Sequence, residues 1–320
     1  MTRLGYQIPN FTYPDVDEDA IFDRVVAQAT AAEAAGFDRV LVMDHFYQLP
    51  GLGAPEEPML ECYSMLSALA QHTEKVRLSA LVTGNTYRNP TLLAKTITTL
   101  DHVSHGRATL GIGAGWFELE HDSLGFAFGS FTDRFEKLEE ALQIIVPMLR
   151  GETPTLSGEH YSVDEAVNSP APVSRIPLMI GGSGEKKTLR MVAQYADESN
   201  LTGEVHEIPR KLEVLNEHCE RLGRDRSEIK VTKLLMVAVA PSEAELEDDL
   251  KAVADAKGWP DEAIEFAKSV LIHGGPDQVA EELSEAVGMG LDGITCNLAV
   301  NGHNPERVKL LGEVANSVLG

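Results

Sequence analysis

The sequence has 320 residues, 43% of them hydrophobic, which is enough for a substantial core, and α/β barrels commonly reach this length as one unit. A formal net charge of −23 argues against a nucleic-acid-binding surface, because phosphates would be repelled along most approaches. Three widely spaced cysteines give no disulfide framework, and no apolar stretch approaches the ~20 residues that span a membrane. We therefore expect a cytoplasmic protein that acts on a small molecule, without nucleic-acid or membrane partners.

Short apolar runs alternate with longer helical patterns along the chain. The predicted strands cover residues 4–9, 39–44, 76–83, 108–113, 177–180, 198–201, 229–239 and 293–297. The predicted helices cover 17–36, 62–72, 89–104, 132–149 (with Thr132 as N-cap), 185–195 and 208–222, and further helices begin near 242, 276 and 305. Eight strand–helix units predict a closed parallel barrel, (β/α)8, with a doubly wound open sheet as the alternative.

Three segments exceed the minimal strand–helix unit. Residues 47–60 form a long loop rich in Pro and Gly, and residues 151–174 predict an excursion with a short hairpin. Residues 242–272 are acidic and helical, which is typical of a solvated face. We expect residues 1–320 to form a single barrel domain that carries these insertions.

The ends of three predicted strands carry most of the candidate chemistry, because a barrel builds its active site there. Gly181, Gly182, Ser183 and Gly184 leave a strand and enter a helix with basic residues, which favours a phosphate site, the alternative being a plain tight turn. Asp44 and His45 end an apolar strand, where the histidine could relay protons or the pair could simply cap the strand.

The third strand end has three glycines at alternate positions, Gly111, Gly113 and Gly115, followed by Trp116. The spacing does not match a dinucleotide fingerprint, so we expect the backbone to approach a flat ring system. His102 and His105 lie near the end of a predicted helix, where favourable contacts with the helix dipole explain them better than a metal site. We expect no metal, which makes a metal-dependent barrel hydrolase a distant possibility.

Several motifs in one order resemble the luciferase-like monooxygenase superfamily, and specifically its branch that uses the deazaflavin coenzyme F420. The matching stretches are residues 42–47, 86–90, 110–116, 180–184 and 195–200. Members of this branch carry an Asp-His pair at the end of the second strand, as Asp44-His45 does here. Flavin-dependent members more often have Glu-His-His at that point.

The resemblance implies a planar cofactor over the barrel mouth, with FMN as the alternative to F420, and a homodimer. It implies a non-prolyl cis peptide at Leu81-Val82 or next to it, a cofactor contact at Asp44, and a proton relay at His45. The remaining cofactor contacts would come from three strand ends: Leu81, Val82 and Thr83; Gly113, Ala114 and Gly115; and Gly181, Gly182, Ser183 and Gly184.

The substrate side departs from the family's sugar-phosphate dehydrogenases. They place a carboxylate where this chain has Trp116, and a Trp where this chain has Gln48-Leu49. A pocket of Phe46, Tyr47, Trp116 and Phe117 favours an apolar or aromatic substrate, although these side chains could simply pack the loops together. The hypothesis is hydride transfer between the deazaflavin C5 and such a substrate. The alternatives are an FMN-dependent monooxygenase with a separate reductase and a non-catalytic F420- or flavin-binding protein.

Overall fold

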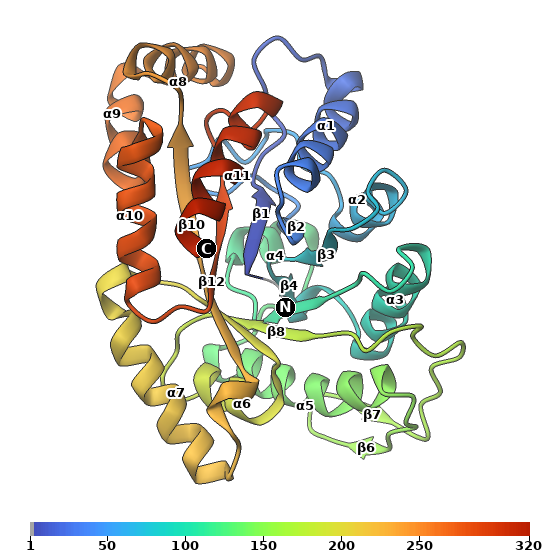
Figure 1. Ribbon diagram of the computed structural model, residues 1–320. Coiled ribbons are helices and arrows are strands. Elements are labelled where there is room, and N and C mark those ends of the chain that lie inside the picture. Colours follow the sequence, from blue (N-terminus) through green and yellow to red (C-terminus); the bar gives the residue numbers. More distant parts are fainter. Residues whose placement is uncertain (1–2) are drawn as a thin grey trace.

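The strands form a ring in the computed structural model, which describes residues 3–320 (Figure 1). Over that range β3 and β4 are two parts of one interrupted strand, so the ring has eight strands. The ring strands are β1 (Leu4–Ile8), β2 (Arg39–Val42), β3 (Arg77–Ala80), β4 (Thr83–Gly84), β5 (Leu110–Gly113), β8 (Leu178–Gly181), β9 (Glu198–Leu201), β10 (Lys230–Val239) and β12 (Gly293–Asn297).

Every neighbouring pair in this ring is parallel. The order is β3-β2-β1-β12-β10-β9-β8-β5-β4, and the two ends meet because β4 continues β3. Leu78 of β3 pairs with Ala108, and Thr83 of β4 pairs with Ile112 of β5. The predicted (β/α)8 barrel is confirmed, and the open-sheet alternative is wrong.

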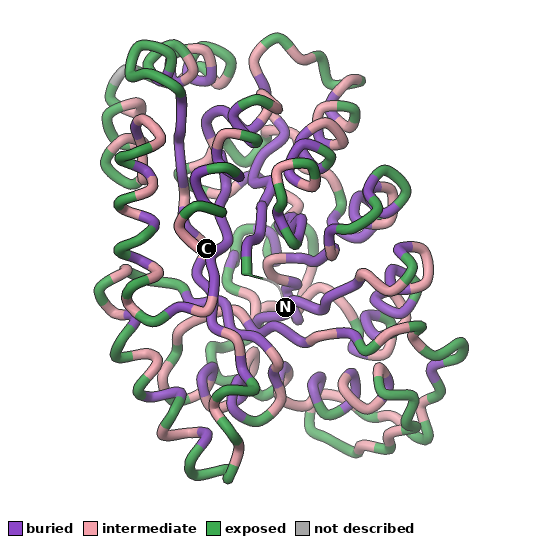
Figure 2. The backbone as a smooth tube through the Cα atoms, viewed as in Figure 1, coloured by how far each residue is buried: buried purple, intermediate pink, exposed green. Residues whose placement is uncertain are grey.

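Helices surround the ring, and most of them bury one face against it, whereas α9 has no buried residue over 262–270 and contacts α8. Figure 2 shows the strands buried, whereas the helices are exposed on their outer sides. The helices are α1 (Ile21–Ala34), α2 (Cys62–Leu69), α3 (Pro90–Val103), α4 (Glu118–Leu124), α5 (Phe131–Leu149), α6 (Thr188–Tyr195), α7 (Ile208–Leu222), α8 (Glu243–Lys257), α9 (Asp261–Val270), α10 (Pro276–Gly288) and α11 (Pro305–Leu319). No helix in residues 3–320 is long and apolar enough to cross a membrane.

Three helix starts differ from the predictions. The helix expected from residue 17 begins with a 3-10 turn, Glu18–Ala20, and α1 starts only at Ile21. The helix expected from residue 185 starts at Thr188, because three turn residues follow the glycine loop and the Leu189 amide bonds to the Gly184 carbonyl. The N-cap expected at Thr132 is Ser130, whose hydroxyl accepts from the Asp133 amide at 3.2 Å while Asp133 Oδ2 accepts from the Ser130 amide at 2.9 Å.

This capping box gives a direct test of the corrected helix start. We expect Ser130→Ala to lower the free energy of unfolding by about 1 kcal/mol, because two first-turn amide contacts depend on the reciprocal Ser130–Asp133 arrangement. Thr132→Ala is the matched control, and chemical denaturation of both variants measures the difference. Equal losses in the two variants would contradict the assignment of Ser130 as the cap.

The three insertions have different structures. Residues 47–60 contain turns without helix or strand, and the expected hairpin in 151–174 is confirmed as β6 (Leu156–Ser157) paired antiparallel with β7 (Ser162–Val163). Residues 242–272 contain α8 and α9. They lead into a strand that was not predicted, β11 (Ile272–Gly274), which pairs with β10 in parallel. The prediction that residues 1–320 form one domain is left as a prediction.

The first and third insertions contact each other through an ion pair. Lys257, at the end of α8, pairs with Glu57 from the loop after β2, and the lysine side chain is fully buried. Trp259 then packs on a small separate apolar cluster that includes Leu246, Leu250 and Val300. The insertions after β2 and β10 are therefore joined to each other as well as to the barrel.

Candidate functional site

The predicted site residues follow strands whose carboxyl ends meet at one mouth of the barrel. Asp44 and His45 follow β2, residues 113–117 end and follow β5, and residues 181–184 end and follow β8. The peptide bond between Leu81 and Val82, which interrupts β3 and β4, is cis, as the resemblance implied. Because the strands are parallel, these residues belong to the same face of the barrel.

Asp44 is buried, and its carboxylate lies in a bidentate ion pair with Arg88. Arg88 Nη1 donates to Oδ2 at 2.5 Å and Nη2 to Oδ1 at 2.9 Å, and the Gly84 amide donates to Oδ2 at 3.0 Å. Burial raises the pKa of Asp44, and the Arg88 guanidinium opposes that effect. The same guanidinium reaches Glu61 Oε1 at 2.8 Å. Asp44 thus fixes the end of β2 to the segment before α3.

His45 lies against a carboxylate that the sequence analysis did not select. Nδ1 of His45 lies 3.0 Å from Oε2 of Glu120, a residue in the first turn of α4. The Glu120 side chain is fully buried, whereas that of His45 is 13% exposed. The imidazole ring also contacts the edges of Trp116 and Phe117, at 5.8 Å between centroids in both cases.

Glu120 accepts hydrogen bonds from three further donors. Oε1 accepts from the amides of Phe46 and Tyr47, at 2.5 and 2.9 Å, and Oε2 accepts from the Tyr87 hydroxyl. Burial alone would raise the pKa of Glu120, but the hydrogen bonds from His45, Tyr87 and the Tyr47 amide lower it below its ordinary value. The same contact and burial raise the pKa of Tyr87, so its hydroxyl keeps its proton. Glu120 is therefore an ionised acceptor.

The glycines at the ends of β5 and β8 make room for Val82. A Cβ at Gly181 would lie 2.9 Å from Val82 Cγ1, and a Cβ at Gly113 would lie 2.9 Å from Val82 Cγ2. Real Cβ atoms essentially never come that close, so both positions exclude larger side chains while Val82 occupies this space. These two glycines therefore set the position of the Leu81-Val82 segment.

This packing predicts a compensating pair of substitutions. We expect Gly181→Ala to lower the free energy of unfolding by about 1–3 kcal/mol through overpacking against Val82. The double variant with Val82→Ala should lose less than the sum of the single variants, because the added methyl then fills the vacated space. A thermodynamic cycle from denaturant unfolding measures the coupling. The control is Gly288→Ala, whose Cβ would meet nothing within 4 Å; additive losses in the cycle would contradict the packing.

The loop Gly181–Gly184 does not lead directly into a helix N-terminus. Gly182 has φ +117°, and Ser183 Oγ both donates to the Thr202 carbonyl at 2.7 Å and accepts from the Thr202 amide at 2.8 Å. Beyond the loop, Lys187 Nζ lies 5.7 and 5.5 Å from the ring centroids of Phe131 and Phe135. Ser183 ties the loop to Thr202, the residue directly after β9, and a basic group with two aromatic rings follows the loop.

The predicted aromatic pocket divides into two groups. Trp116 is 59% exposed and stacks on the buried Phe117 at 5.2 Å between centroids, beside His45. Phe46 instead packs on Tyr87 and Phe126, at 5.1 and 5.4 Å. Tyr47 contributes its amide to Glu120, as described above.

The segment between β5 and α4 is held by side chains from other elements. Ala114 is partly buried, and Gly115 has φ +80° and accepts a hydrogen bond from Arg134 Nε at 3.1 Å. His121, next to Glu120, lies 2.7 Å from Thr86 Oγ1. Thr83, which the resemblance assigned to the cofactor, has its hydroxyl 2.5 Å from that of Tyr63.

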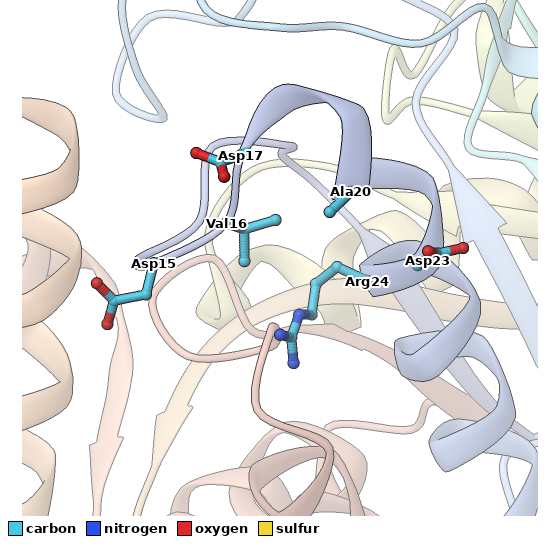
Figure 3. A pocket seen from close by; sticks show the side chains of 6 residues that line it. All are labelled: Asp15, Val16, Asp17, Ala20, Asp23 and Arg24. Atoms are coloured by element: carbon cyan, nitrogen blue, oxygen red, sulfur yellow. The ribbon is translucent and has the colours of Figure 1, made fainter.

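Two surface hollows lie away from these residues. One of about 290 Å³ adjoins the loop between β1 and α1 and is lined by six residues, among them three aspartates and Arg24 (Figure 3). Another of about 450 Å³ lies among residues at the amino-terminal ends of the strands, such as Arg77 and Glu198. Neither is lined by a predicted site residue. In residues 3–320, no group of three or more His, Cys, Asp or Glu side chains could hold a metal ion.

The residues missed by the sequence analysis are Glu120, Tyr87 and Arg88. Tyr87 and Arg88 lie in a stretch that carried the family resemblance, so that stretch was a signal for them. Glu120 had no such signal, because no helix was predicted between residues 113 and 132, where the structure has α4. Its contact with His45 joins residues 75 positions apart and depends on the fold.

Comparison with known proteins identifies the family of the chain. The family model described as luciferase-like monooxygenase matches residues 2–293. An F420-dependent glucose-6-phosphate dehydrogenase of Microbacterium testaceum (strain StLB037) is 29% identical over 248 residues, 76% of this chain and 70% of that protein. The pyrimidine monooxygenase RutA of Acinetobacter baylyi is 27% identical over 256 residues, 77% of this chain and 66% of that protein.

The chain spans 70%, 66% and 55% of the lengths of three such dehydrogenases. Among solved structures, an F420-dependent secondary alcohol dehydrogenase in complex with an F420-acetone adduct superposes with a TM-score of 0.79 at 20% identity, covering 99% of both chains. That likeness supports the fold.

Proposed function

The chain belongs to the luciferase-like monooxygenase family, and from this premise we propose that it is an oxidoreductase that uses coenzyme F420. The proposed reaction is hydride transfer between C5 of the deazaflavin and a small organic substrate. The observation that carries it is His45, a partly exposed imidazole that follows β2 at the barrel mouth and is held by Glu120; β2 pairs with β3, which the cis Leu81-Val82 bond follows. Relatives named F420-dependent glucose-6-phosphate dehydrogenases support the cofactor.

The residues at the mouth fit a flat heterocycle with a phosphate tail. Gln7 Nε2 lies 3.4 Å from the carbonyl oxygen of Leu81, and Asn297 Nδ2 donates to Gln7 Oε1 at 3.0 Å. Asn297 Oδ1 is buried and has no hydrogen-bond partner among the described residues, so it could accept a ring N–H. Gly184 would hold the phosphate through its backbone N–H group, with Ser183 fixing the loop, whereas the Gly182 amide already donates to the Asn200 carbonyl at 2.9 Å.

The deazaflavin supplies a carbon that accepts or releases a hydride, and the chain's own side chains supply the rest. His45 would hold or move the accompanying proton at a substrate heteroatom. Asp44 keeps the end of β2 in place through Arg88, so its contribution to cofactor binding would come through the backbone around it. Trp116 and Phe117 would exclude water from the reacting atoms.

We further propose an apolar or aromatic substrate. Trp116 offers an exposed indole face beside His45, and such faces bind flat or apolar groups. The carboxylate nearest to His45, that of Glu120, already accepts four hydrogen bonds and is fully buried. It would therefore not be free to bind sugar hydroxyls.

An FMN-dependent monooxygenase with a separate reductase is the second candidate, favoured by the similarity to RutA. A non-catalytic F420- or flavin-binding protein is a third. The homodimer and the cytoplasmic location implied earlier are left as predictions.

Titration of the purified protein with F420 and with FMN tests the cofactor. We expect quenching of F420 fluorescence with saturable binding, and weaker or no binding of FMN, because the Asp-His end of β2 is typical of the F420 branch. Tight binding of FMN without F420 binding, together with oxygen consumption by reduced FMN, would instead establish the second candidate. Binding without turnover across enones, aldehydes and alcohols would support the third.

The role of His45 is tested separately. We expect His45→Ala to lower kcat by about 100-fold or more, since general acid–base groups typically contribute that much. His303→Ala, at a histidine outside the proposed site, is a control that should retain activity. Full turnover by His45→Ala would reject the proton relay and leave the cofactor assignment standing.

A further inference from the structure

The two oxygens of the Glu120 carboxylate accept hydrogen bonds from different kinds of donor. Oε1 accepts from two backbone amides, those of Phe46 and Tyr47, whereas Oε2 accepts from Tyr87 and lies 3.0 Å from His45 Nδ1. The side chain is fully buried. Within residues 3–320 its ion-pair partner is His45, and no lysine or arginine nitrogen lies 4.0 Å or less from it. The carboxylate is thus held in one orientation by the backbone.

This arrangement decides which nitrogen of His45 carries the proton. The hydrogen bonds lower the pKa of Glu120, so the group is an ionised carboxylate that can only accept. A contact of 3.0 Å between Oε2 and Nδ1 then requires a proton on Nδ1. In a neutral imidazole the other nitrogen, Nε2, carries a lone pair and accepts.

We propose that Glu120 is a positioning residue that keeps neutral His45 protonated on Nδ1 and leaves Nε2 as the acceptor toward the reacting atoms. It also places a negative charge beside the ring whose Nε2 would accept a proton. Tyr87 holds Oε2 from the other side and limits its rotation. The role of Nε2 in turnover rests on the proposed function, whereas the tautomer is a property of the protein alone.

The isosteric variant Glu120→Gln gives a sharp test. The two amides of Phe46 and Tyr47 need an acceptor, so the glutamine oxygen is expected in the place of Oε1 and its NH2 group in the place of Oε2. That NH2 group faces His45 Nδ1 and must donate to it. We therefore expect the neutral ring to switch its proton from Nδ1 to Nε2.

Nitrogen-15 NMR of the histidine ring, recorded without cofactor or substrate, reads the tautomer directly. The wild type should show a protonated Nδ1 and a bare Nε2, and Glu120→Gln the reverse, with the signals identified by their loss in His45→Gln. Glu118→Gln, on the exposed side of the same helical turn, is the matched control and should leave the ring unchanged. Tyr87→Phe, which removes one donor to Oε2, should retain the wild-type tautomer.

A neutral wild-type ring that carries its single proton on Nε2 would overturn the proposal, and this result does not depend on whether Glu120→Gln folds. So would a folded Glu120→Gln that keeps the proton on Nδ1. With turnover established, Glu120→Gln should lower kcat by roughly 100-fold or more with little change in KM, because the acceptor nitrogen is then blocked. An unchanged kcat would refute positioning. Absence of any F420-dependent turnover would refute the proposed function and leave the tautomer result to decide this inference.

Discussion

The geometry of the barrel mouth depends on the buried carboxylate of Glu120. It lies on α4, and it binds the chain directly after β2 through His45 and two backbone amides and the segment before α3 through Tyr87. A buried charge that loses its hydrogen-bond donors is costly, so these partners have to stay in place together. Three segments far apart in the sequence are thereby held together around the two carboxylate oxygens of Glu120.

A second ionic contact, between Asp44 and Arg88, joins the chain after β2 to the segment before α3. Asp44 binds Arg88 directly, whereas the neighbouring residues His45 and Tyr87 are joined through Glu120. The two contacts differ in kind, because Asp44 has a cationic partner whereas Glu120 relies on neutral donors and an imidazole. One fixes the strand end, and the other fixes the orientation of the ring that projects from it.

The barrel could be predicted because its signal is repeated. Apolar runs, glycine stops and helix caps recur along the chain, and an error of a few residues at one helix, such as Ser130 in place of Thr132, does not change the topology. The cis bond at Leu81-Val82 was implied by family resemblance and not by any local pattern. In contrast, the need for glycine at Gly113 and Gly181 arises from the Val82 side chain, which only the folded structure brings between them.

The site was predicted in part for the same physical reason. Strand ends in a parallel barrel meet at one face, so His45 and the glycine loops could be placed from the sequence. Glu120 could not, because the short helix α4 was not predicted, and only the fold brings this residue to His45. The glycine loop after β8 was expected to lead directly into a helix, but a turn of three residues separates it from α6, so a phosphate bound there would contact the loop's own amides.

These contacts also bear on how a substrate could be selected. The two carboxylates at this end of β2, those of Asp44 and Glu120, are both buried and both bound to partners from the same chain. What faces outward beside the imidazole is the indole of Trp116, supported from behind by Phe117. A site of this kind discriminates by shape and by the removal of apolar surface from water, with the single imidazole providing polarity. Selectivity would then follow the size and flatness of the substrate more closely than its charge.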